Sequence, residues 1–379
     1  MIQRIYEDLA NFFHPKEVLI LYGARRVGKT TLLDNFLKVT KLRYRLDTGD
    51  NIRTQELLSS LDLSRIKEYV EGYELLAIDE AQFIPHIGKA LKIIIDTIPG
   101  IKVIVTGSSS FDLSQEVGEP LTGRKTTLTM YPISQLELLK SNKNKFDLKQ
   151  KLEEFLIYGS YPQIVTATSR DEKNRIITEL VNSYLFKDIL ALETIKAPRL
   201  LLDLLKLLAF QIGSEVSFNE LSTQLGFDVK TVARYIDLLE KTFVIIRLGG
   251  FSRNLRSEVT SKAKYYFLDN GIRNGVISQF NELSLRNDIG QLWENFIITE
   301  RLKKRTYTNI YGQSYFWRTY EQREIDLIEE RDGELYPFEC KWSMKEVKPI
   351  IPRDWVTAYP LSKELGVIHP DNYLDFVAE

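Results

Sequence analysis

Residues 23–30 read Gly-Ala-Arg-Arg-Val-Gly-Lys-Thr, and this stretch decides the fold of the first third of the chain. It fits the pattern Gly-x-x-x-x-Gly-Lys-Ser/Thr, follows an apolar run over residues 18–22 and opens a segment of helical periodicity over residues 29–39. In this strand–loop–helix context the pattern binds phosphate, because the loop turns its backbone N–H groups inward and the helix adds its positive end. The stretch therefore predicts a nucleotide site.

The residues of this loop have distinct expected roles. Gly23 and Gly28 would supply permissive dihedrals and close backbone approach. Lys29 would place its charge on the β- and γ-phosphates, and the Thr30 hydroxyl would complete the shell of a Mg²⁺ ion. We therefore expect ATP and Mg²⁺ as cofactors. The residues expected to line them are Gly23, Ala24, Arg25, Arg26, Val27, Gly28, Lys29, Thr30 and Thr31, with Asp79 and Ser108 from later segments.

Composition limits the class of protein. A chain of 379 residues with 44% hydrophobic and 27% charged residues is typical of a soluble protein of about two to four domains. Its net charge of −1 excludes a global basic field, so nucleic acid would have to bind a local patch. The single cysteine, Cys340, excludes an internal disulfide. Since neither a signal peptide nor a membrane-spanning run is evident, we expect a cytoplasmic protein with no membrane partner.

The first third alternates expected strands and helices. Such alternation predicts an α/β domain with a parallel sheet, whose ligands lie at the carboxyl ends of the strands. The expected strands are residues 18–22, 42–46, 75–78, 101–106 and 125–130.

Acidic and polar residues follow these strands. Asp79 would hold Mg²⁺, and Glu80 would polarise the water that attacks the γ-phosphate. Ser108, after the fourth strand, would either sense the γ-phosphate or cap the next helix. Arg124, before the fifth strand, would either reach a nucleotide in a neighbouring subunit or form an ion pair within the domain.

The chain resembles the AAA-type ATPases of archaea and bacteria that carry a C-terminal domain of unknown function. The resemblance extends over nearly the whole chain. Its motifs here are the phosphate loop, Asp79-Glu80-Ala81-Gln82, Leu121-Thr122-Gly123-Arg124, Tyr158-Gly159-Ser160-Tyr161-Pro162, residues 184–189, residues 264–271, Trp293-Glu294-Asn295-Phe296 and Trp317-Arg318-Thr319. The resemblance implies a P-loop ATPase domain of the ASCE/AAA type, a helical region, a winged helix and an α/β domain similar to PD-(D/E)XK nucleases. The expected boundaries are 1–133, 134–210, 211–280 and 281–379.

The middle of the chain supports this order on its own residues. Residues 152–208 have helical periodicity with a break at Pro198. Two helices capped by Ser217 and Asp228 precede expected strands at 243–248 and 265–268, which is typical of a helix–turn–helix with a wing. The module would either bind DNA or dock a protein. The residues expected to contact DNA are Lys230, Thr231, Arg234, Arg253 and Arg256.

The last segment holds a second possible chemistry. Asp332-Gly333 predicts a hairpin in which Glu339 and Lys341 point to one face and converge with Asp326. An Asp, a Glu and a Lys two residues beyond the Glu form the layout of PD-(D/E)XK nucleases, whose carboxylates hold Mg²⁺ and whose lysine orients or activates water. Glu294 matches the additional acidic position of that family. The alternative is a cross-strand salt bridge on a solvated hairpin.

Three functions remain open on these grounds. The first couples ATP hydrolysis to metal-dependent cleavage of DNA or another nucleic acid. The second is an ATP-driven switch or docking module with a catalytically silent nuclease-like domain, acting on a protein partner or as a homo-oligomer. The third is a nucleotide sensor that does not hydrolyse ATP.

Overall fold

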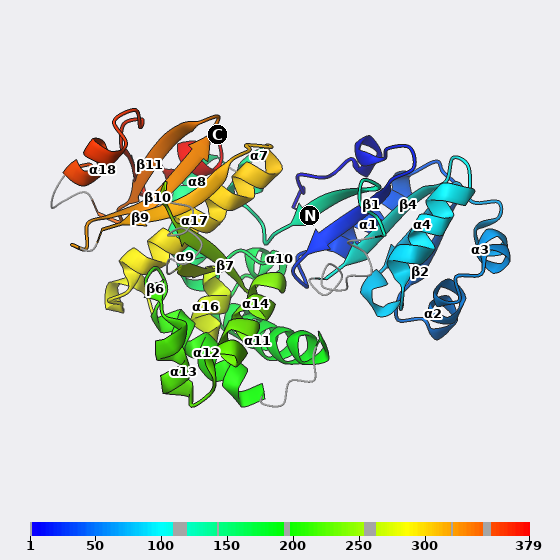
Figure 1. The fold of residues 1–379 in the computed structure, drawn as a ribbon, viewed down its shortest axis with the longest axis horizontal. Helices are drawn as coiled ribbons and strands as arrows, with labels where there is room; N and C mark the ends of the chain where they lie inside the picture. Colours follow the sequence, from blue (N-terminus) through cyan, green and yellow to red (C-terminus); the bar gives the residue numbers. More distant parts are fainter. Residues whose placement is uncertain are drawn as a thin grey trace. The chain divides into compact units, whose positions relative to one another are not determined.

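The computed structural model describes residues 2–108, 120–141, 144–192, 198–253, 263–319, 321–343 and 350–379, and only the backbone of 183–192 and 198. These residues form two compact units (Figure 1). The N-terminal unit is Gln3–Pro132 with Lys241–Phe243, and the C-terminal unit is Ile133–Glu240 and Val244–Glu379 with the first two residues. Arg256, expected to contact DNA, lies outside the described residues.

The N-terminal unit alternates strands and helices in the expected order. Its elements are η1 (Leu9–Phe12), β1 (Val18–Gly23), α1 (Lys29–Val39), β2 (Tyr44–Thr48), α2 (Ile52–Ser59), α3 (Leu63–Val70), β3 (Leu75–Asp79), η2 (Ala81–Phe83), α4 (Ile87–Thr97), β4 (Lys102–Gly107) and β5 (Lys125–Met130).

The five strands form one parallel sheet in the order β2-β3-β4-β1-β5, which confirms the expected α/β architecture. Two strands are displaced from their expected positions: β2 covers residues 44–48, not 42–46, and β4 covers residues 102–107, not 101–106. Just before β2, the N–H of Arg43 donates to the Glu74 carboxylate, and the Arg43 carbonyl accepts from the N–H groups of Glu74 and Leu75. Pairing with β3 starts at Tyr44 and Leu75.

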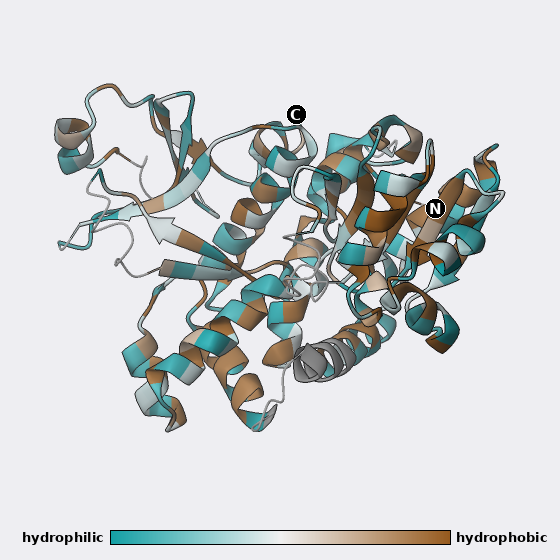
Figure 2. Ribbon diagram, turned by 45° about the vertical axis from the view of Figure 1, so that its right-hand side comes forward, coloured by the Kyte–Doolittle hydropathy of each residue, from teal (hydrophilic) through white to brown (hydrophobic). Residues whose placement is uncertain are grey.

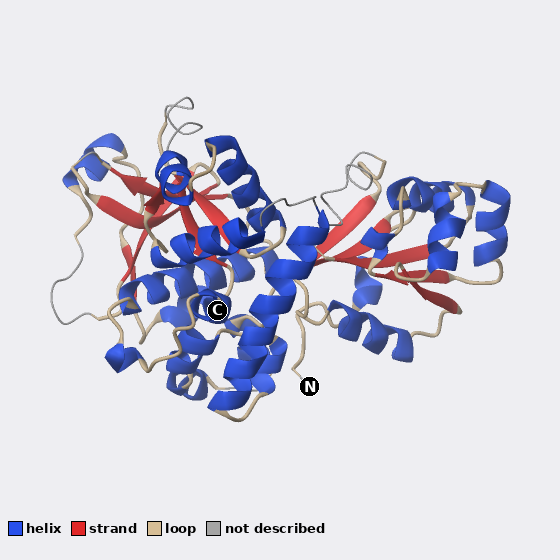
Figure 3. Ribbon diagram, turned by 90° about the horizontal axis from the view of Figure 1, so that it is seen from below, coloured by secondary structure: helices blue, strands red, loops and turns tan. Residues whose placement is uncertain are grey.

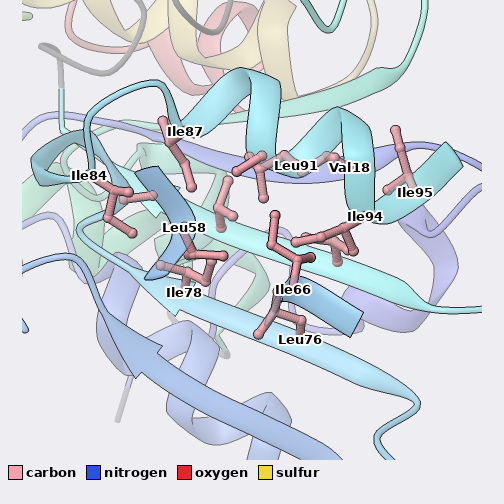
Figure 4. Close-up of a cluster of buried hydrophobic side chains, with 14 of the residues drawn as sticks. Val18, Leu58, Ile66, Leu76, Ile78, Ile84, Ile87, Leu91, Ile94 and Ile95 are labelled. Atoms are coloured by element: carbon pink, nitrogen blue, oxygen red, sulfur yellow. The ribbon is translucent and has the colours of Figure 1, made fainter. Parts of the chain in front are cut away.

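Alternate residues of these strands face the two sides of the sheet, as the pleat requires. One side packs against α2, α3 and α4, where Leu58, Ile66 and Leu91 are fully buried against the strands (Figure 4). Hydrophobic residues run along the central strands in Figure 2, as expected of a sheet buried on both faces. The core thus holds the carboxyl ends of β1, β3 and β4 in one fixed row.

The C-terminal unit combines a helical region with a second sheet (Figure 3). Its elements are α7 (Gln135–Lys140), α8 (Lys145–Gln150), α9 (Leu152–Tyr158), α10 (Pro162–Thr166), α11 (Arg170–Leu192), α12 (Pro198–Phe210), β6 (Glu215–Val216), α13 (Phe218–Leu225), α14 (Val229–Lys241), β7 (Ile245–Gly250), β8 (Ala263–Phe267), α16 (Asn270–Val276), η3 (Leu283–Leu285), α17 (Ile289–Tyr307), β9 (Gln313–Arg318), β10 (Glu324–Arg331), β11 (Glu334–Cys340), α18 (Arg353–Ala358), β12 (Gly366–Ile368) and α19 (Tyr373–Val377).

The second sheet has seven strands in the order β12-β11-β10-β9-β7-β8-β6. Strands β7 and β9 pair in parallel at Gly249–Tyr315 and Gly250–Phe316, so the sheet crosses the expected domain boundary at residue 280. The hairpin of β10 and β11 is confirmed, and both residues of its turn, Asp332 and Gly333, have positive φ. The division of residues 134–379 into three domains stays a prediction.

Two of the sequence motifs pack directly on each other in this unit. A Cβ atom at Gly159 would lie 1.9 Å from the Asp269 carboxylate, and one at Gly271 would lie 2.0 Å from the Tyr158 carbonyl oxygen. Asp269 also accepts hydrogen bonds from the backbone N–H groups of Ser160 and Ile272. These motifs therefore join α9 to α16, which gives them a structural role.

No helix within the described ranges is both long enough and apolar enough to cross a bilayer.

Candidate functional site

The loop between β1 and α1 has the geometry of a phosphate cradle. Gly23, Arg26 and Gly28 have φ values of 145°, 58° and 98°, and this sequence of left-handed residues turns the loop tightly onto the start of α1. Gly28 is the N-cap of α1 and has no side chain to cover the first N–H groups of the helix. The loop therefore presents backbone donors at the helix N-terminus.

The side chain of Lys29 lies inside this loop. It is buried, and its Nζ donates to the carbonyl oxygens of Gly23 and Ala24 at 2.8 Å each. An arginine that the sequence did not single out supports the loop from outside: Arg4 donates to the carbonyl oxygens of Val27 and Tyr131. The loop is thus held on both sides by cationic side chains bonded to its backbone.

The carboxyl end of β3 brings Asp79 to the loop. The Thr30 hydroxyl lies 2.9 Å from Asp79 Oδ2, and the Thr106 hydroxyl donates to Asp79 Oδ1. Thr30 and Asp79 therefore supply adjacent hard oxygen ligands, the donor set that Mg²⁺ takes beside a nucleotide. The two residues fit a magnesium ion at this position.

Glu80 has an unusual backbone that its surroundings impose. Its φ of 50° lies in the left-handed region, which is uncommon for a residue with a side chain. Its N–H donates to Thr106 Oγ1 at 3.1 Å, and a Cβ atom at Gly49 would lie 2.1 Å from its carbonyl oxygen. The end of β4 and the turn after β2 thus fix the direction in which the Glu80 side chain leaves the strand.

The carboxylate of Glu80 is in turn bonded by Gln82, which donates from Nε2 to Glu80 Oε2. The other end of the same amide accepts: the N–H of Ser108 donates to Gln82 Oε1 at 3.3 Å. Ser108 is buried next to the end of β4. Its two expected roles stay predictions, because the residues that follow it lie outside the described part of the chain.

Arg124 forms an ion pair with Asp96 of α4, in the same unit. Its backbone carbonyl accepts from the N–H of Val18 at 2.9 Å, so its main chain also anchors the start of β1. The pairing is the one expected of a structural arginine. A role toward a neighbouring subunit stays a prediction.

The C-terminal unit gathers a second group of predicted residues. Asp326 lies in a bulge of β10, where two residues, Asp326 and Leu327, oppose one residue of β9. Its Oδ2 accepts from the N–H of Cys340 at 2.8 Å, and Glu339 makes a side-chain hydrogen bond with it. Lys341 Nζ lies 2.7 Å from Glu339 Oε2. Asp326, Glu339 and Lys341 are thus brought together as the spacing predicts.

Glu294 is bonded by two residues of β8. Its Oε1 accepts from Tyr266 Oη at 2.6 Å and from Lys264 Nζ at 3.2 Å, and the same lysine pairs with Glu324. Lys264 and Tyr266 are two residues apart on β8 and therefore point to one face. Among the side chains that the structure describes, no three His, Cys, Asp or Glu residues are arranged to hold a metal ion. The metal-binding role of Glu294, Asp326 and Glu339 stays a prediction.

Burial governs the ionisation of this cluster. It raises the pKa of Glu294 to about 7, with the charge of Asp326 as a further cause. Burial, followed by the charge of Asp326, also raises the pKa of Glu339 to about 7. Burial lowers the pKa of Lys264, but Glu294 and Glu324 outweigh it and raise the pKa overall. Lys264 therefore remains charged and balances part of the buried negative charge.

The residues expected to contact DNA differ in their surroundings. The hydroxyl of Thr231 donates to Asp228 Oδ2 at 2.7 Å, and the N–H of Thr231 donates to Asp228 Oδ1. Thr231 therefore completes the helix cap. Lys230 is exposed, and the guanidinium of Arg253 lies over the ring of Tyr359.

Several residues of both sites are not indicated by the sequence. Thr106 lies in an expected strand and Gln82 in the Asp79-Glu80-Ala81-Gln82 motif. Their positions near the ends of β4 and β3 are the feature of the sequence that could have indicated a role at the site. Lys264 and Tyr266 belong to a motif with no assigned role, and their shared partner lies 28 to 30 residues away. Spacing along the chain does not indicate such contacts.

The family comparisons agree with this layout. Residues 15–139 match a family described as AAA domain. Residues 149–283 and 289–370 match two families, each described as a domain of unknown function (DUF8612 and DUF4143). The AAA match includes the phosphate loop, Asp79, Glu80 and Arg124. The parallel sheet and this match together define the N-terminal unit as an AAA-family, ATPase-like fold.

Three relatives that match most of this chain carry the description uncharacterized protein. The chain is 25% identical over 348 residues to the uncharacterized protein MJ1544 of Methanocaldococcus jannaschii, covering 86% of this chain and 74% of that protein. It is 26% identical over 337 residues to Rv2008c of Mycobacterium tuberculosis, covering 88% and 72%. An uncharacterized protein of Haemophilus influenzae is 25% identical over 366 residues, covering 90% and 86%.

Solved structures give weaker likenesses. A RuvB variant of Thermotoga maritima has a TM-score of 0.31 at 17% identity, covering 61% of this chain and 82% of that one. The signal transduction ATPase PH0952 of Pyrococcus horikoshii has a TM-score of 0.29 at 14% identity, covering 76% and 43%. Scores of this size do not establish a shared fold.

Proposed function

We propose that the N-terminal unit binds ATP with Mg²⁺ and hydrolyses it. The observation that carries the proposal is the hydrogen-bonded row of Thr30, Asp79 and Thr106 beside the loop that encloses Lys29. Only folding brings Thr30, 49 residues before Asp79, to this carboxylate. A hydroxyl from the phosphate loop and a carboxylate from a neighbouring strand end are the ligands that a nucleotide-bound magnesium ion requires.

Each residue has one task in this reaction. The loop N–H groups and the N-terminus of α1 hold the phosphates, and Lys29 adds a point charge to the β- and γ-phosphates. Magnesium, held by Thr30 and Asp79, would neutralise the charge of the transferred phosphoryl group. Glu80 orients water and accepts its proton.

The test of the phosphate site is Lys29→Ala. We expect it to abolish ATP turnover, because the loop loses the charge that stabilises the transferred phosphoryl group. Lys38→Ala is the matched control, since Lys38 is exposed on the same helix. Retained turnover in Lys29→Ala would show that the phosphate site is misassigned.

Glu80→Gln separates hydrolysis from sensing. The variant should bind ATP normally and release phosphate at least about a hundredfold more slowly, since a general base contributes 10² or more. A wild-type protein that binds ATP but releases no phosphate would instead be a nucleotide sensor.

We also propose, as a second function, that the cluster of Asp326, Glu339 and Lys341 cleaves nucleic acid with Mg²⁺, in a PD-(D/E)XK-like domain. It is supported by the bulge that aims Asp326 at Glu339 and by the contact of Lys341 with Glu339. Glu294 is bonded to Lys264 and Tyr266, and no three His, Cys, Asp or Glu side chains among the described residues are arranged to hold a metal ion. The competing proposal is therefore a catalytically silent domain in an ATP-driven switch or docking module.

Cleavage of plasmid and single-stranded DNA with Mg²⁺ or Mn²⁺ decides between these two. The nuclease proposal expects nicking by the wild type and none by Lys341→Ala. Lys363→Ala is the control, because Lys363 pairs with Glu334 on the surface of the same unit. Equal, background-level cutting by all three proteins would contradict the nuclease proposal and support the catalytically silent domain.

Nucleic-acid binding by a winged helix of α13, α14, β7 and β8 is a further part of the proposal. It is supported by the order of two helices and an antiparallel strand pair, with Lys230 and Arg234 on α14. A slope of binding against salt concentration near zero would argue for protein docking instead, because phosphate contacts release counterions.

A further inference from the structure

We infer that Gln82 is a positioning residue for ATP hydrolysis: its amide ties the carboxylate of Glu80 to the end of β4 at Ser108. The inference rests on the proposed function, since it concerns the residue that orients the attacking water. The side-chain hydrogen bonds of Gln82 join Glu80 and Ser108, so its effect on the reaction would pass through Glu80.

The first observation is that one amide spans two strand ends. Gln82 Nε2 donates to Glu80 Oε2, and Gln82 Oε1 accepts from the N–H of Ser108 at 3.3 Å. Glu80 follows β3 and Ser108 follows β4, and these strands are neighbours in the sheet. A glutamine suits this bridge because its side chain carries a donor and an acceptor on the same planar group.

The second observation is that the backbone of Glu80 is contacted on both sides. Its φ of 50° is held by the Thr106 hydroxyl at its N–H and by Gly49 at its carbonyl oxygen. The freedom left to Glu80 is that of its side-chain torsions. Gln82 occupies one carboxylate oxygen and thereby selects the orientation of the other, which can then face a water molecule.

The third observation is the link to Ser108. The carbonyl end of the Gln82 amide is fixed by a backbone N–H that follows the fully buried Thr106 by two residues. Thr106 in turn bonds Asp79. Asp79, Glu80 and the end of β4 are therefore joined in one closed set of hydrogen bonds, so a shift of the strand end would reorient the Glu80 carboxylate.

Two near-isosteric substitutions separate the two ends of the amide. Gln82→Met removes both hydrogen bonds at nearly constant volume. Gln82→Glu keeps an acceptor for Ser108 but replaces the donor with a carboxylate beside Glu80. Gln3→Met is the control, because it makes the same chemical change on the N-terminal segment of the same unit.

The experiment measures kcat and KM for ATP, together with the dissociation constant of a fluorescent ATP analogue. We expect kcat to fall about tenfold or more in Gln82→Met and further in Gln82→Glu, with the dissociation constant unchanged within about twofold, since a misplaced catalytic group costs rate without loss of binding. Gln3→Met should match the wild type. Wild-type kcat in Gln82→Met, or an equal loss of kcat and of binding, would overturn the inference.

A double variant shows whether Gln82 acts through Glu80. In a Glu80→Gln background, Gln82→Met should cause no further loss of the single-turnover rate, because residues that act as a unit are not additive. Independent, multiplicative losses would contradict the inference. If instead wild type and Glu80→Gln hydrolyse ATP at equal rates, the proposed role of Glu80 is wrong. If Glu80→Gln is impaired and Gln82→Met has the wild-type rate, only the inference about Gln82 is wrong.

Discussion

At the scale of single residues, the proposed ATP site contains two glycines that are required by packing. A Cβ atom at Gly23 would lie 2.0 Å from the carbonyl oxygen of Met130, so the end of β5 excludes any side chain there. Gly49 has the same relation to the carbonyl oxygen of Glu80. Glycine is required at these two positions because another backbone segment passes close by, in addition to any close approach of phosphate.

Gly49→Ala should therefore impair hydrolysis through Glu80. The added methyl would displace the Glu80 carbonyl, and we expect kcat to fall severalfold or more with near-normal ATP binding. Gly100→Ala is the control, because Gly100 has open space around its Cβ position and its φ of 77° adds only backbone strain of about 1 kcal/mol. Steady-state kinetics on both variants checks the prediction, and equal kcat values would contradict it.

The raised pKa of Glu339 predicts a pH dependence of stability. Its pKa is about 7 in the folded protein against an ordinary value of 4.5, so the folded state binds more protons between these values. The free energy of unfolding should therefore fall as pH rises from about 4.5 to 7, by an amount on the order of 2 kcal/mol.

Glu339→Gln should reduce this slope to the part that Glu294 contributes, because the pKa of Glu294 is also raised to about 7, and it should make the C-terminal unit more stable than wild type at pH 8. Urea unfolding at several pH values measures it, with Glu321→Gln as the control because the side chain of Glu321 is 73% exposed. An unchanged slope in Glu339→Gln would refute the assignment. Tryptophan fluorescence is a selective probe, since all four tryptophans (Trp293, Trp317, Trp342 and Trp355) lie in this unit.

At the scale of elements, one strand face connects β8 to α17. Lys264 and Tyr266 both bond the same oxygen of Glu294, and Lys264 also reaches Glu324 on β10. Three elements far apart in sequence thus meet at one buried ammonium group. The motif over residues 264–271 consequently has a structural role at each end, with Asp269 capping α16.

Lys264→Met should destabilise the C-terminal unit by about 3 kcal/mol, because breaking a buried pair leaves uncompensated carboxylates. Lys363→Met, on the surface, should change the free energy of unfolding by no more than about 1 kcal/mol. The double variant Lys264→Met/Glu294→Gln should recover part of the loss. Urea midpoints followed by tryptophan fluorescence compare the three variants, and Lys264→Met as stable as wild type would rule out the buried pair.

At the scale of the whole molecule, each unit has its own core and its own site. Saturating ATP–Mg²⁺ should stabilise the N-terminal unit by about 2.7 kcal/mol at a hundred times the dissociation constant. Hydrogen exchange should slow in α1 and at the end of β3. The same experiment on Lys29→Ala is the control and should show no protection. Absence of protection in well-folded wild type would refute nucleotide binding.

Much of the N-terminal fold was predictable because its signals are local. The phosphate loop, the apolar strands and the Asp-Glu pair each occupy a short stretch, and parallel order follows from strand–helix alternation. The bounds of β2 were displaced by two residues, and the contact of Arg43 with Glu74 just before this strand joins distant residues. Residues 152–210 form four helices, α9, α10, α11 and α12. Their helical periodicity predicts helix over this range but does not indicate where each helix ends.

The sequence by itself determined the chemical identity of the loop, the alternation of strands and helices in the first third of the chain and the hairpin turn at Asp332-Gly333, since each depends on neighbours along the chain. Tertiary structure alone decided that Thr106 bonds Asp79, that Gln82 bridges Glu80 and Ser108, and that Lys264 takes Glu294 as its partner. The physical reason is that hydrogen bonds and ion pairs depend on distances of about 3 Å between side chains, and only the packing of sheets and helices sets those distances.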